Sequence, residues 1–383
     1  MQPWGTEIVP QRTAFLHTEN LPHRLFLLAD LPLHYPQKPV AYPNAERFSK
    51  EDETEEIKVI AELPYSWEKI KDKTILVSGG TGFIGTAFVD VIKYRNQKYN
   101  ENIKVISFSR RGGESSEYLE CIKANVKQPL HYEGKIDYII HLASNTHPKQ
   151  YAEDPIGTIM TNIYGCDNLL KLAVEKKARF LLASSVEIYG QGTAIPMNEE
   201  YCGYIDCNLA RSGYNEAKRT CEALTQSYRS VFGVNAVIAR FARVFGADKK
   251  HDTKAMSQFM DKAVLGEDII LKSKGQQRYS YCYIADAVSG LLKLLLDGQD
   301  GEAYNISNDD DGLTLGEYAE YIASLANLKV RYEIENNESV SKATFALLDT
   351  HKIKNIGWKP QYSVKDGLKR TYMIKKEQLT NVD

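Results

Sequence analysis

The 383-residue chain lacks the features that would point to a membrane or a nucleic acid. It has no apolar stretch of about 18 residues or more, which a membrane-spanning helix would need. It has no basic block, and its formal net charge is -2, so no polyanion partner is expected. The opening sequence MQPWGTEIVP has no charged segment followed by an apolar one, so no secretory signal is expected.

The six cysteines show neither the spacing of a metal site nor the density of a disulfide framework. This cysteine usage fits reduced thiols in a cytosol, so we expect a cytoplasmic location. We expect no bound metal. The composition, with 43% hydrophobic and 26% charged residues, is that of a soluble enzyme. The length allows two domains, each with ample core.

The most informative stretch is KTILVSGGTGFIG at residues 73–85. Residues 75–77 read as a buried strand. Gly79, Gly82 and Gly85 fall where a tight turn, close phosphate approach and helix-to-sheet packing leave no room for a Cβ. A helix beginning near Gly85 would point its N-terminal amides at the phosphates. The stretch therefore predicts a dinucleotide-binding site.

Beyond this loop, strand and helix patterns alternate, with helical spacing at residues 168–174 between later strands. The further strands are expected at residues 104–108, 138–142, 180–183 and 236–239. Helices are expected at residues 255–265, 285–296 and 315–325. The fold class is therefore α/β, a Rossmann-type doubly wound parallel sheet with a smaller mixed C-terminal substrate domain.

Three segments are expected from this pattern. Residues 1–70 form an N-terminal extension, whose apolar patch at 25–31 is expected to pack on the body or on a partner subunit. Residues 71–245 form the dinucleotide-binding domain and residues 246–383 the substrate-binding domain. The extension is assigned no chemistry.

A second motif, YNEAK, places Tyr214 and Lys218 four residues apart, 29 residues after Ser185. Such spacing puts both side chains on one helix face. A phenol with a pKa of about 10 is a poor base, but a neighbouring ammonium group favours the phenolate. Ser185 follows a central strand, where open sheets bind ligands, and could relay a hydroxyl proton. A Tyr and a Lys at this spacing are otherwise usually a surface pair.

These motifs resemble the extended short-chain dehydrogenases, specifically the nucleotide-sugar epimerases, dehydratases and decarboxylases. The resemblance covers residues 71–375 and includes GGTGFIG, HLAS, SSVEIYG, YNEAK and GWKP. It is most similar to UDP-glucuronate decarboxylases. It implies that Tyr214 takes the proton from the sugar 4-hydroxyl while hydride passes to a nicotinamide. Lys218 would hold the nicotinamide ribose, and Ser185 the 4-oxygen.

Glu187 decides which chemistry follows, because a 4-ketone acidifies the proton at C5. A glutamate two positions after the serine resembles the dehydratases and decarboxylases more than simple 4-epimerases. Facing the sugar, it could assist loss of the 6-hydroxyl, inversion at C5 or loss of a C6 carboxylate. Its alternative role is a carboxylate that supports the loop.

Several positions depart from these subfamilies. Val186 stands where dTDP-glucose dehydratases carry an aspartate, and residues 340–352 lack the arginine of the decarboxylases. Arg243 replaces the substrate-side asparagine, and Arg278 lies one residue before the arginine position expected to bind the diphosphate. Both arginines, with Ser184 and Ser185, are the candidate substrate-binding residues.

The cofactor's 2′ position is expected at the end of the second strand, where NAD-preferring members carry an acid. Ser109 stands there, followed by Arg110 and Arg111, so NADP is favoured over NAD, although paired arginines can also form a solvated turn. The candidate cofactor-binding residues are Gly79, Thr81, Gly82, Phe83, Ile84, Gly85, Ser109, Arg110, Arg111, Asn125, Val126, Leu142, Ala143, Ser144, Tyr214 and Lys218.

The sequence thus predicts a nucleotide-sugar-modifying enzyme that works through a transient 4-keto sugar, in the making of activated sugars for surface glycans. Decarboxylation and 4,6-dehydration are the favoured outcomes. The alternatives are a 4-epimerase or 4-keto reductase and, in another class, a non-catalytic NAD(P)-sensing module. A sensor would need the glycine loop but not Ser185, Tyr214 and Lys218. The resemblance also implies a homodimer that buries the helix bearing Tyr214.

Overall fold

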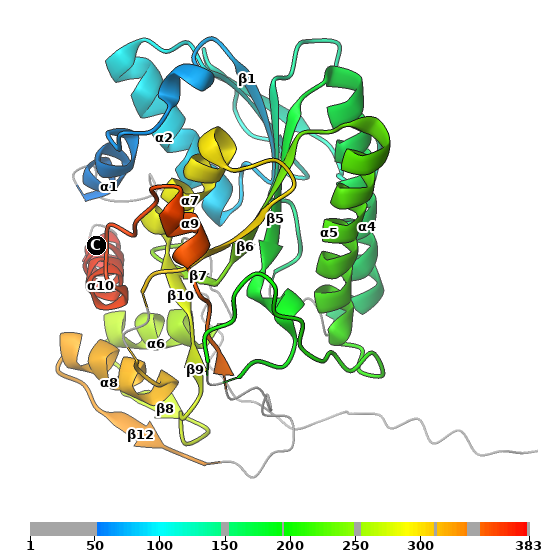
Figure 1. Cartoon of the computed structure of the whole chain (residues 1–383). Helices are drawn as coiled ribbons and strands as arrows, with labels where there is room; N and C mark the ends of the chain where they lie inside the picture. Colours follow the sequence, from blue (N-terminus) through cyan, green and yellow to red (C-terminus); the bar gives the residue numbers. More distant parts are fainter. Residues whose placement is uncertain are drawn as a thin grey trace, which may run out of the picture. The chain divides into compact units, whose positions relative to one another are not determined.

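Seven parallel strands form the central sheet of the computed structural model (Figure 1). The structure describes residues 52–146, 153–193, 195–248, 254–309, 312–334 and 345–380; the patch at 25–31 lies outside these ranges. The strands run in the order β3-β2-β1-β4-β5-β6-β11. Their bounds are β1 Thr74–Ser78, β2 Lys104–Ser109, β3 Leu119–Lys123, β4 Tyr138–His141, β5 Arg179–Ser185, β6 Ala236–Phe241 and β11 Ala303–Ile306.

The chain moves outward from β1 to β3 and then restarts on the other side of β1 with β4. This reversal is the switch point at which open parallel sheets bind ligands beyond the carboxyl ends of their strands. The inner strands are buried on both faces, whereas edge strand β3 is only half-buried. In β1, for example, Ile75 and Val77 belong to one apolar cluster and Leu76 to the other. Side chains of a strand alternate in direction, so this near-continuous apolar run supplies both cores.

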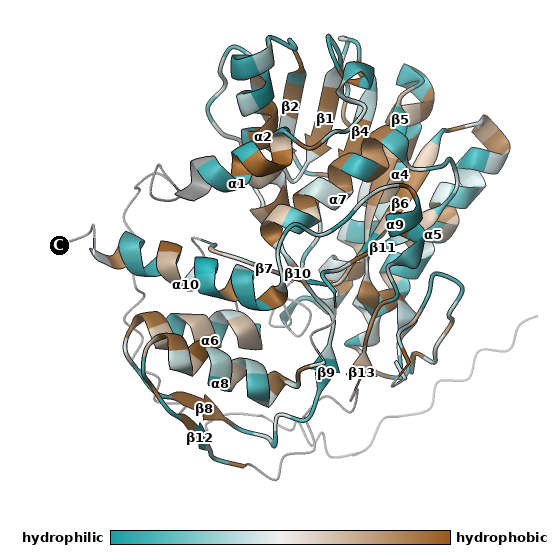
Figure 2. Ribbon diagram, turned by 60° about the vertical axis from the view of Figure 1, so that its left-hand side comes forward, coloured by the Kyte–Doolittle hydropathy of each residue, from teal (hydrophilic) through white to brown (hydrophobic). Residues whose placement is uncertain are grey.

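Helices cover both faces of the sheet (Figures 1 and 2). On one face α4 (Pro155–Lys176) packs against α5 (Ser212–Phe232). On the other face α2 (Phe83–Tyr99) packs against α7 (Ile284–Asp297). Helix α4 begins well before the expected residues 168–174, because the Asp154 side chain accepts a hydrogen bond from the Gly157 amide at 2.8 Å and Pro155 takes the first helical position.

A smaller part of the structure lies beyond the carboxyl ends of the strands. Its helices α6, α8 and α10 pack on one another and form part of the same apolar cluster as α2 and α7. Three short parallel pairs, β7 with β10, β8 with β12 and β9 with β13, form separate two-stranded sheets outside the central sheet. The bounds are β7 Arg243–Phe245, α6 Ala255–Val264, β8 Ile269–Leu271, β9 Arg278–Tyr279, β10 Tyr281–Tyr283, α8 Leu315–Leu325, β12 Val330–Tyr332, β13 Phe345–Ala346, α9 His351–Asn355 and α10 Val364–Thr380.

The predicted fold class is confirmed, and each strand named from the sequence is present. Strands β3 and β11 were not among those named, because β3 carries charged residues at a half-exposed edge and the short apolar run of β11 is interrupted by Asn305. Strand β11 pairs with β6, so residues beyond 245 complete the central sheet. The division at residue 245 between two domains therefore stays a prediction.

The end of the N-terminal segment is a helix, α1 (Asp52–Ala61), followed by a short 3-10 turn, η1 (Trp67–Lys69). Helix α1 packs on α2 and α7. Its buried Glu56 pairs with Arg370 at 2.8 Å, and Arg95 donates to the Ala61 carbonyl at 2.9 Å. This part of the extension is thus anchored to the body. None of the helices in the described ranges has the length and apolar character to cross a membrane.

Candidate active site

A cavity of about 1520 Å³ opens at the carboxyl ends of β1, β2, β4, β5 and β6. That volume exceeds the roughly 300–1,000 Å³ of a pocket for one drug-sized ligand. Of the residues proposed from the sequence, all line it except Arg278. They are Gly79, Thr81, Gly82, Phe83, Ile84, Gly85, Ser109, Arg110, Arg111, Asn125, Val126, Leu142, Ala143, Ser144, Ser184, Ser185, Glu187, Tyr214, Lys218 and Arg243.

The glycine loop between β1 and α2 has the shape that a pyrophosphate needs. Gly79 has a φ of +78°, and a Cβ there would lie 3.0 Å from the Ala143 nitrogen. A Cβ on Gly85 would lie 2.4 Å from the Gly79 oxygen, so a side chain would force the helix away from the loop. No side chain caps the start of α2 at Gly82. The amides of its first turn, which lack intrahelical acceptors, therefore face the cavity and fit a dinucleotide phosphate.

The end of β2 would hold the second ribose of a dinucleotide. Ser109 is half-buried there, and its hydroxyl donates to the Gly112 carbonyl at 3.3 Å. Arg110 and Arg111 are exposed, and Arg111 donates to the Thr81 carbonyl of the glycine loop at 3.3 Å. Asn168 donates to the Val126 carbonyl at 3.0 Å and so anchors the Asn125–Val126 pair to α4.

Tyr214 and Lys218 occupy one face of α5, as their spacing predicts. They are 6% and 4% exposed, and the Lys218 ammonium nitrogen lies 5.8 Å from the centre of the Tyr214 ring. Lys218 donates to the Ala183 carbonyl of β5 at 2.9 Å, which holds the helix against the strand. Burial lowers the pKa of Lys218. The pair therefore forms a buried wall of the cavity rather than a surface pair.

Ser185 and Glu187 meet this wall from the end of β5. Ser185 caps the 3-10 turn η2 (Val186–Tyr189), because its hydroxyl accepts from the Glu187 amide at 3.2 Å. The Glu187 carboxylate accepts from Asn215 at 3.3 Å and from Arg243 at 3.4 Å. Asn215, the residue after Tyr214, also donates to the Glu187 carbonyl at 2.8 Å. It was not among the proposed residues, and its place inside YNEAK was the available signal.

The two arginines proposed to bind substrate have different surroundings. Arg243, on β7, lines the cavity with its guanidinium carbon 3.9 Å from the centre of the Tyr279 ring. Arg278 is not among the lining residues, whereas Tyr279 is. Neighbouring residues of a strand point to opposite faces, so β9 cannot present both to the cavity. The structure thus assigns the lining position to Tyr279 rather than to Arg278.

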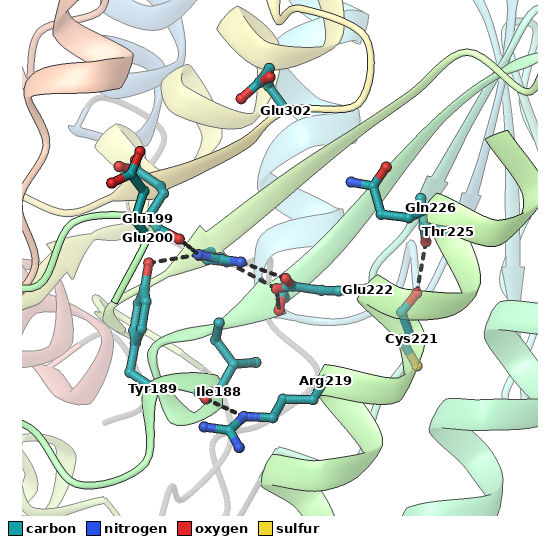
Figure 3. A network of polar contacts seen from close by, with 12 residues as sticks. Ile188, Tyr189, Glu199, Glu200, Arg219, Cys221, Glu222, Thr225, Gln226 and Glu302 are labelled. Atoms are coloured by element: carbon teal, nitrogen blue, oxygen red, sulfur yellow. Dashed lines mark hydrogen bonds and ion pairs between the residues drawn. The ribbon is translucent and has the colours of Figure 1, made fainter. Parts of the chain in front are cut away.

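Ser184 belongs to a buried network behind the site. Its hydroxyl donates to Glu222 on α5 at 2.5 Å, so this hydroxyl is bound within the protein although Ser184 lines the cavity. Glu222 forms an ion pair with Arg240 of β6 at 2.7 Å. Figure 3 shows Glu222, Tyr189 and Glu199, and Arg240 donates to all three. The network ties α5, β6 and η2 together behind the cavity wall formed by Tyr214 and Lys218.

His141, at the end of β4, is fully buried between the glycine loop and Lys218. Its Nδ1 lies 2.8 Å from the Ser78 hydroxyl oxygen, which accepts from the Ala143 amide at 3.3 Å. The other ring nitrogen, Nε2, is buried and has no hydrogen-bond partner within the described residues. Burial, helped by the charge of Lys218, lowers the pKa of His141 to about 3.

We expect His141 to make the protein less stable as the pH falls. Below a pH of about 6.5 the unfolded chain gains a proton at this residue, and the folded chain does not until about pH 3. The free energy of unfolding should therefore fall by at most about 1.4 kcal/mol per pH unit across this window. Urea unfolding of wild type and His141→Gln at several pH values measures the difference. The exposed control His131→Gln should keep the wild-type slope, and an unchanged slope in His141→Gln would contradict the assignment.

The fold and the site together define a class of protein. A parallel sheet that reverses at β1 and β4, with a glycine loop at the reversal and a buried Tyr–Lys pair beside a serine, is the arrangement of a dinucleotide-dependent enzyme. The chain belongs to the NAD dependent epimerase/dehydratase family, which it matches over residues 75–307. The expected family and enzyme class are confirmed.

Its relatives include several decarboxylases. UDP-glucuronic acid decarboxylase 3 of Arabidopsis thaliana is 33% identical over 303 residues, covering 77% of this chain and 86% of that protein. UDP-glucuronic acid decarboxylase 1 of Danio rerio is 31% identical over 308 residues, covering 78% and 72%. These matches extend from the sheet region into the smaller part of the structure.

Solved structures share the fold at lower identity. The dTDP-glucose 4,6-dehydratase DesIV of Streptomyces venezuelae, with NAD and TYD bound, has a TM-score of 0.69 at 23% identity, covering 79% of this chain and 97% of that one. The UDP-glucose 4-epimerase of Thermotoga maritima has a TM-score of 0.68 at 21% identity, covering 80% and 99%.

Proposed function

We propose that this protein decarboxylates a nucleotide-diphosphate uronate, with UDP-glucuronate as the first candidate, through a transient 4-keto sugar. The observation that carries the proposal is that four side chains suited to this chemistry line one cavity. They are Ser185, Glu187, Tyr214 and Lys218. The decarboxylases among the relatives favour loss of a carboxylate over the other outcomes open to this site.

The first step is oxidation at sugar C4. The cofactor, when bound, supplies a nicotinamide that accepts hydride from C4 and later returns it. Tyr214 is positioned to take the proton of the 4-hydroxyl, and Lys218 is held beside it by the Ala183 carbonyl. Ser185 orients the 4-oxygen, so the hydroxyl proton leaves toward a fixed phenol.

The second step exploits the ketone. A 4-keto uronate is a β-keto acid, so the C5–C6 bond can break with release of carbon dioxide. The bonding electron pair passes through C5 to the C4 oxygen, where Tyr214 and Ser185 can donate hydrogen bonds to the developing negative charge. C5 then takes up a proton, and hydride return to C4 leaves no net oxidation. Glu187 lines the cavity beside Ser185, and we propose that it assists the delivery of this proton to C5.

A 4,6-dehydration is the second candidate, because the same Glu187 carboxylate could remove the C5 proton and so expel a 6-hydroxyl. Its weakness is Val186, which is buried and carries no acid to protonate the leaving group. A 4-epimerase or 4-keto reductase would need no group at C5. A module that only senses the dinucleotide would not need the side chains of Ser185, Glu187, Tyr214 and Lys218 in its cavity.

The decisive experiment is incubation of the purified protein with UDP-glucuronate in deuterated water, in parallel with NADP and with NAD, followed by mass spectrometry and proton NMR. Release of carbon dioxide with one deuterium at C5 and no net cofactor reduction is expected. A panel of UDP, dTDP, GDP and CDP sugars tests the alternatives. Loss of water from a neutral sugar would favour dehydration instead, and inversion at C4 without deuterium would identify a 4-epimerase.

We propose NADP as the preferred cofactor. Two exposed arginines follow Ser109 at the cavity, and Ser109 adds no negative charge against a 2′-phosphate. Fluorescence titration should give a lower Kd for NADPH than for NADH. The reverse order would identify Arg110 and Arg111 as a solvated turn.

We propose that the protein is a homodimer through α4 and α5. Helix α4 exposes Ile156, Met160 and Tyr164, at 70%, 38% and 50%, four residues apart on one face, and such an apolar stripe favours association. The double variant Ile156→Asp and Tyr164→Asp should shift the mass measured by light scattering at micromolar concentration from dimer to monomer. A monomeric wild type would refute the proposal.

A cytoplasmic location, with a role in making activated sugars for surface glycans, completes the proposal. All six cysteines are free thiols, as a reducing compartment favours. Fractionation of the source cells would test it.

A further inference from the structure

We infer that Arg243 reads the C6 carboxylate of a nucleotide uronate and so selects the substrate. The inference rests on the proposed function in that both place a uronate in the same cavity. It concerns Arg243 of β7, which lines that cavity and interacts with Glu187.

Arg243 is held in place by two contacts that leave one terminal nitrogen of its guanidinium without a hydrogen-bond partner in the described residues. Its guanidinium carbon lies 3.9 Å from the centre of the Tyr279 ring, and Nη2 donates to Glu187 at 3.4 Å. The other terminal nitrogen, Nη1, is buried and has no hydrogen-bond partner within the described ranges. A buried charged donor without a partner is costly, so a ligand that supplies an anion there would gain affinity.

The position of Arg243 identifies which part of a substrate it would meet. One carboxylate, that of Glu187, links it to the turn that begins at the Ser185 hydroxyl. Ser185 orients the sugar 4-oxygen in the proposed mechanism, so Arg243 lies at the reacting end of the sugar rather than at a remote end of the nucleotide. The substituent that lies two bonds from C4 and can carry a negative charge is the C6 carboxylate.

Charge balance supports this assignment. The Glu187 carboxylate alone would repel a second carboxylate in the same pocket. A guanidinium presents several donors in one plane, so it can pair with Glu187 through Nη2 and with the substrate through Nη1. Arg243 therefore lets an acidic group that acts at C5 share the cavity with an anionic sugar.

The test compares matched ligands that differ only at C6. Isothermal titration in a Tyr214→Phe background without added nicotinamide cofactor, in which turnover is strongly slowed, gives the Kd of UDP-glucuronate, UDP-glucose and UDP. The parent should bind UDP-glucuronate about 10- to 100-fold more tightly than UDP-glucose, the range for a charge-assisted hydrogen bond. Arg243→Gln should abolish this ratio and leave the Kd of UDP and UDP-glucose unchanged. Arg243→Lys, which keeps the charge, should retain part of it.

Three results would overturn the inference. Equal weakening of all three ligands in Arg243→Gln would place Arg243 on the diphosphate. An unchanged ratio would make it only a clamp on Glu187 and Tyr279. The Tyr214→Phe parent could also bind UDP-glucuronate no more tightly than UDP-glucose, and GDP-mannuronate no more tightly than GDP-mannose. That result would show that Arg243 does not recognise a carboxylate. The exposed Arg331→Gln is the matched control, and thermal unfolding with NAD verifies folding.

Failure of the proposed function has a different signature. A wild-type enzyme that releases no carbon dioxide from UDP-glucuronate, yet binds it with the Arg243-dependent preference, would refute decarboxylation and retain the carboxylate reader. Release of carbon dioxide by the wild type, together with an unchanged ratio of the two Kd values in Arg243→Gln, would support decarboxylation and refute the role of Arg243 in binding the carboxylate.

Discussion

Replacement of Tyr214 by phenylalanine should lower turnover by about 10²- to 10⁴-fold, the usual contribution of a positioned acid or base. Phenylalanine retains the buried ring and its packing beside Lys218 but has no oxygen to take the 4-hydroxyl proton. Single-turnover experiments that follow nicotinamide absorbance with UDP-glucuronate measure the loss. Cofactor affinity should stay within the same order of magnitude, because the phosphate contacts are proposed to come from the glycine loop and not from Tyr214.

Tyr332→Phe is the matched control for this variant. Its hydroxyl contacts Glu320 on the surface at 3.1 Å, and Tyr332 does not line the cavity. The control should turn over at the wild-type rate. Wild-type turnover by Tyr214→Phe, with normal cofactor binding, would instead show that another group takes the proton.

Replacement of Arg240 by methionine should destabilise the protein by about 3–5 kcal/mol, the cost of breaking a buried ion pair on one side. The paired side chains of Arg240 and Glu222 are only 11% and 12% exposed. Without the guanidinium, the Glu222 carboxylate would keep the Ser184 hydroxyl but lose its cation. Tyr189 would lose a donor in the same step. Urea unfolding measures the change.

The double variant Arg240→Met and Glu222→Leu should recover much of this loss, because neither charge then remains buried. The surface pair of Arg331 and Asp268 provides a control, since Arg331→Met should cost no more than about 1 kcal/mol. A double variant that is less stable than Arg240→Met would mean that the network stabilises through its hydrogen bonds rather than through charge balance.

Much of the site could be predicted because its signals are local. The glycine loop lies within 13 residues of chain, and its turn conformation and lack of room for a Cβ depend on adjacent backbone. Tyr214 and Lys218 share a helix face whatever surrounds the helix. Asn215 could have been included on the same ground, as it occupies the next position of that helix.

Other parts depended on strand direction and on distant partners. A two-residue strand, β9, decides that Tyr279 faces the cavity and that Arg278 does not, and no periodic pattern is readable over so short a length. The interaction of Arg243 with Glu187 spans 56 positions of sequence, and that of Glu56 with Arg370 spans 314. No local rule relates residues at such separations.

The sequence by itself determined the class of enzyme and predicted the dinucleotide loop and the serine, tyrosine and lysine that we propose to carry the proton. Each of these is encoded by residues a few positions apart, whose geometry follows from backbone conformation alone. Only the tertiary structure decided that β11 completes the sheet, that Ser184 belongs to the Arg240 network and that Arg243 stands beside Glu187. These arrangements arise when strands far apart in sequence pair and bring their carboxyl ends to one edge, so they exist only once the whole sheet has formed.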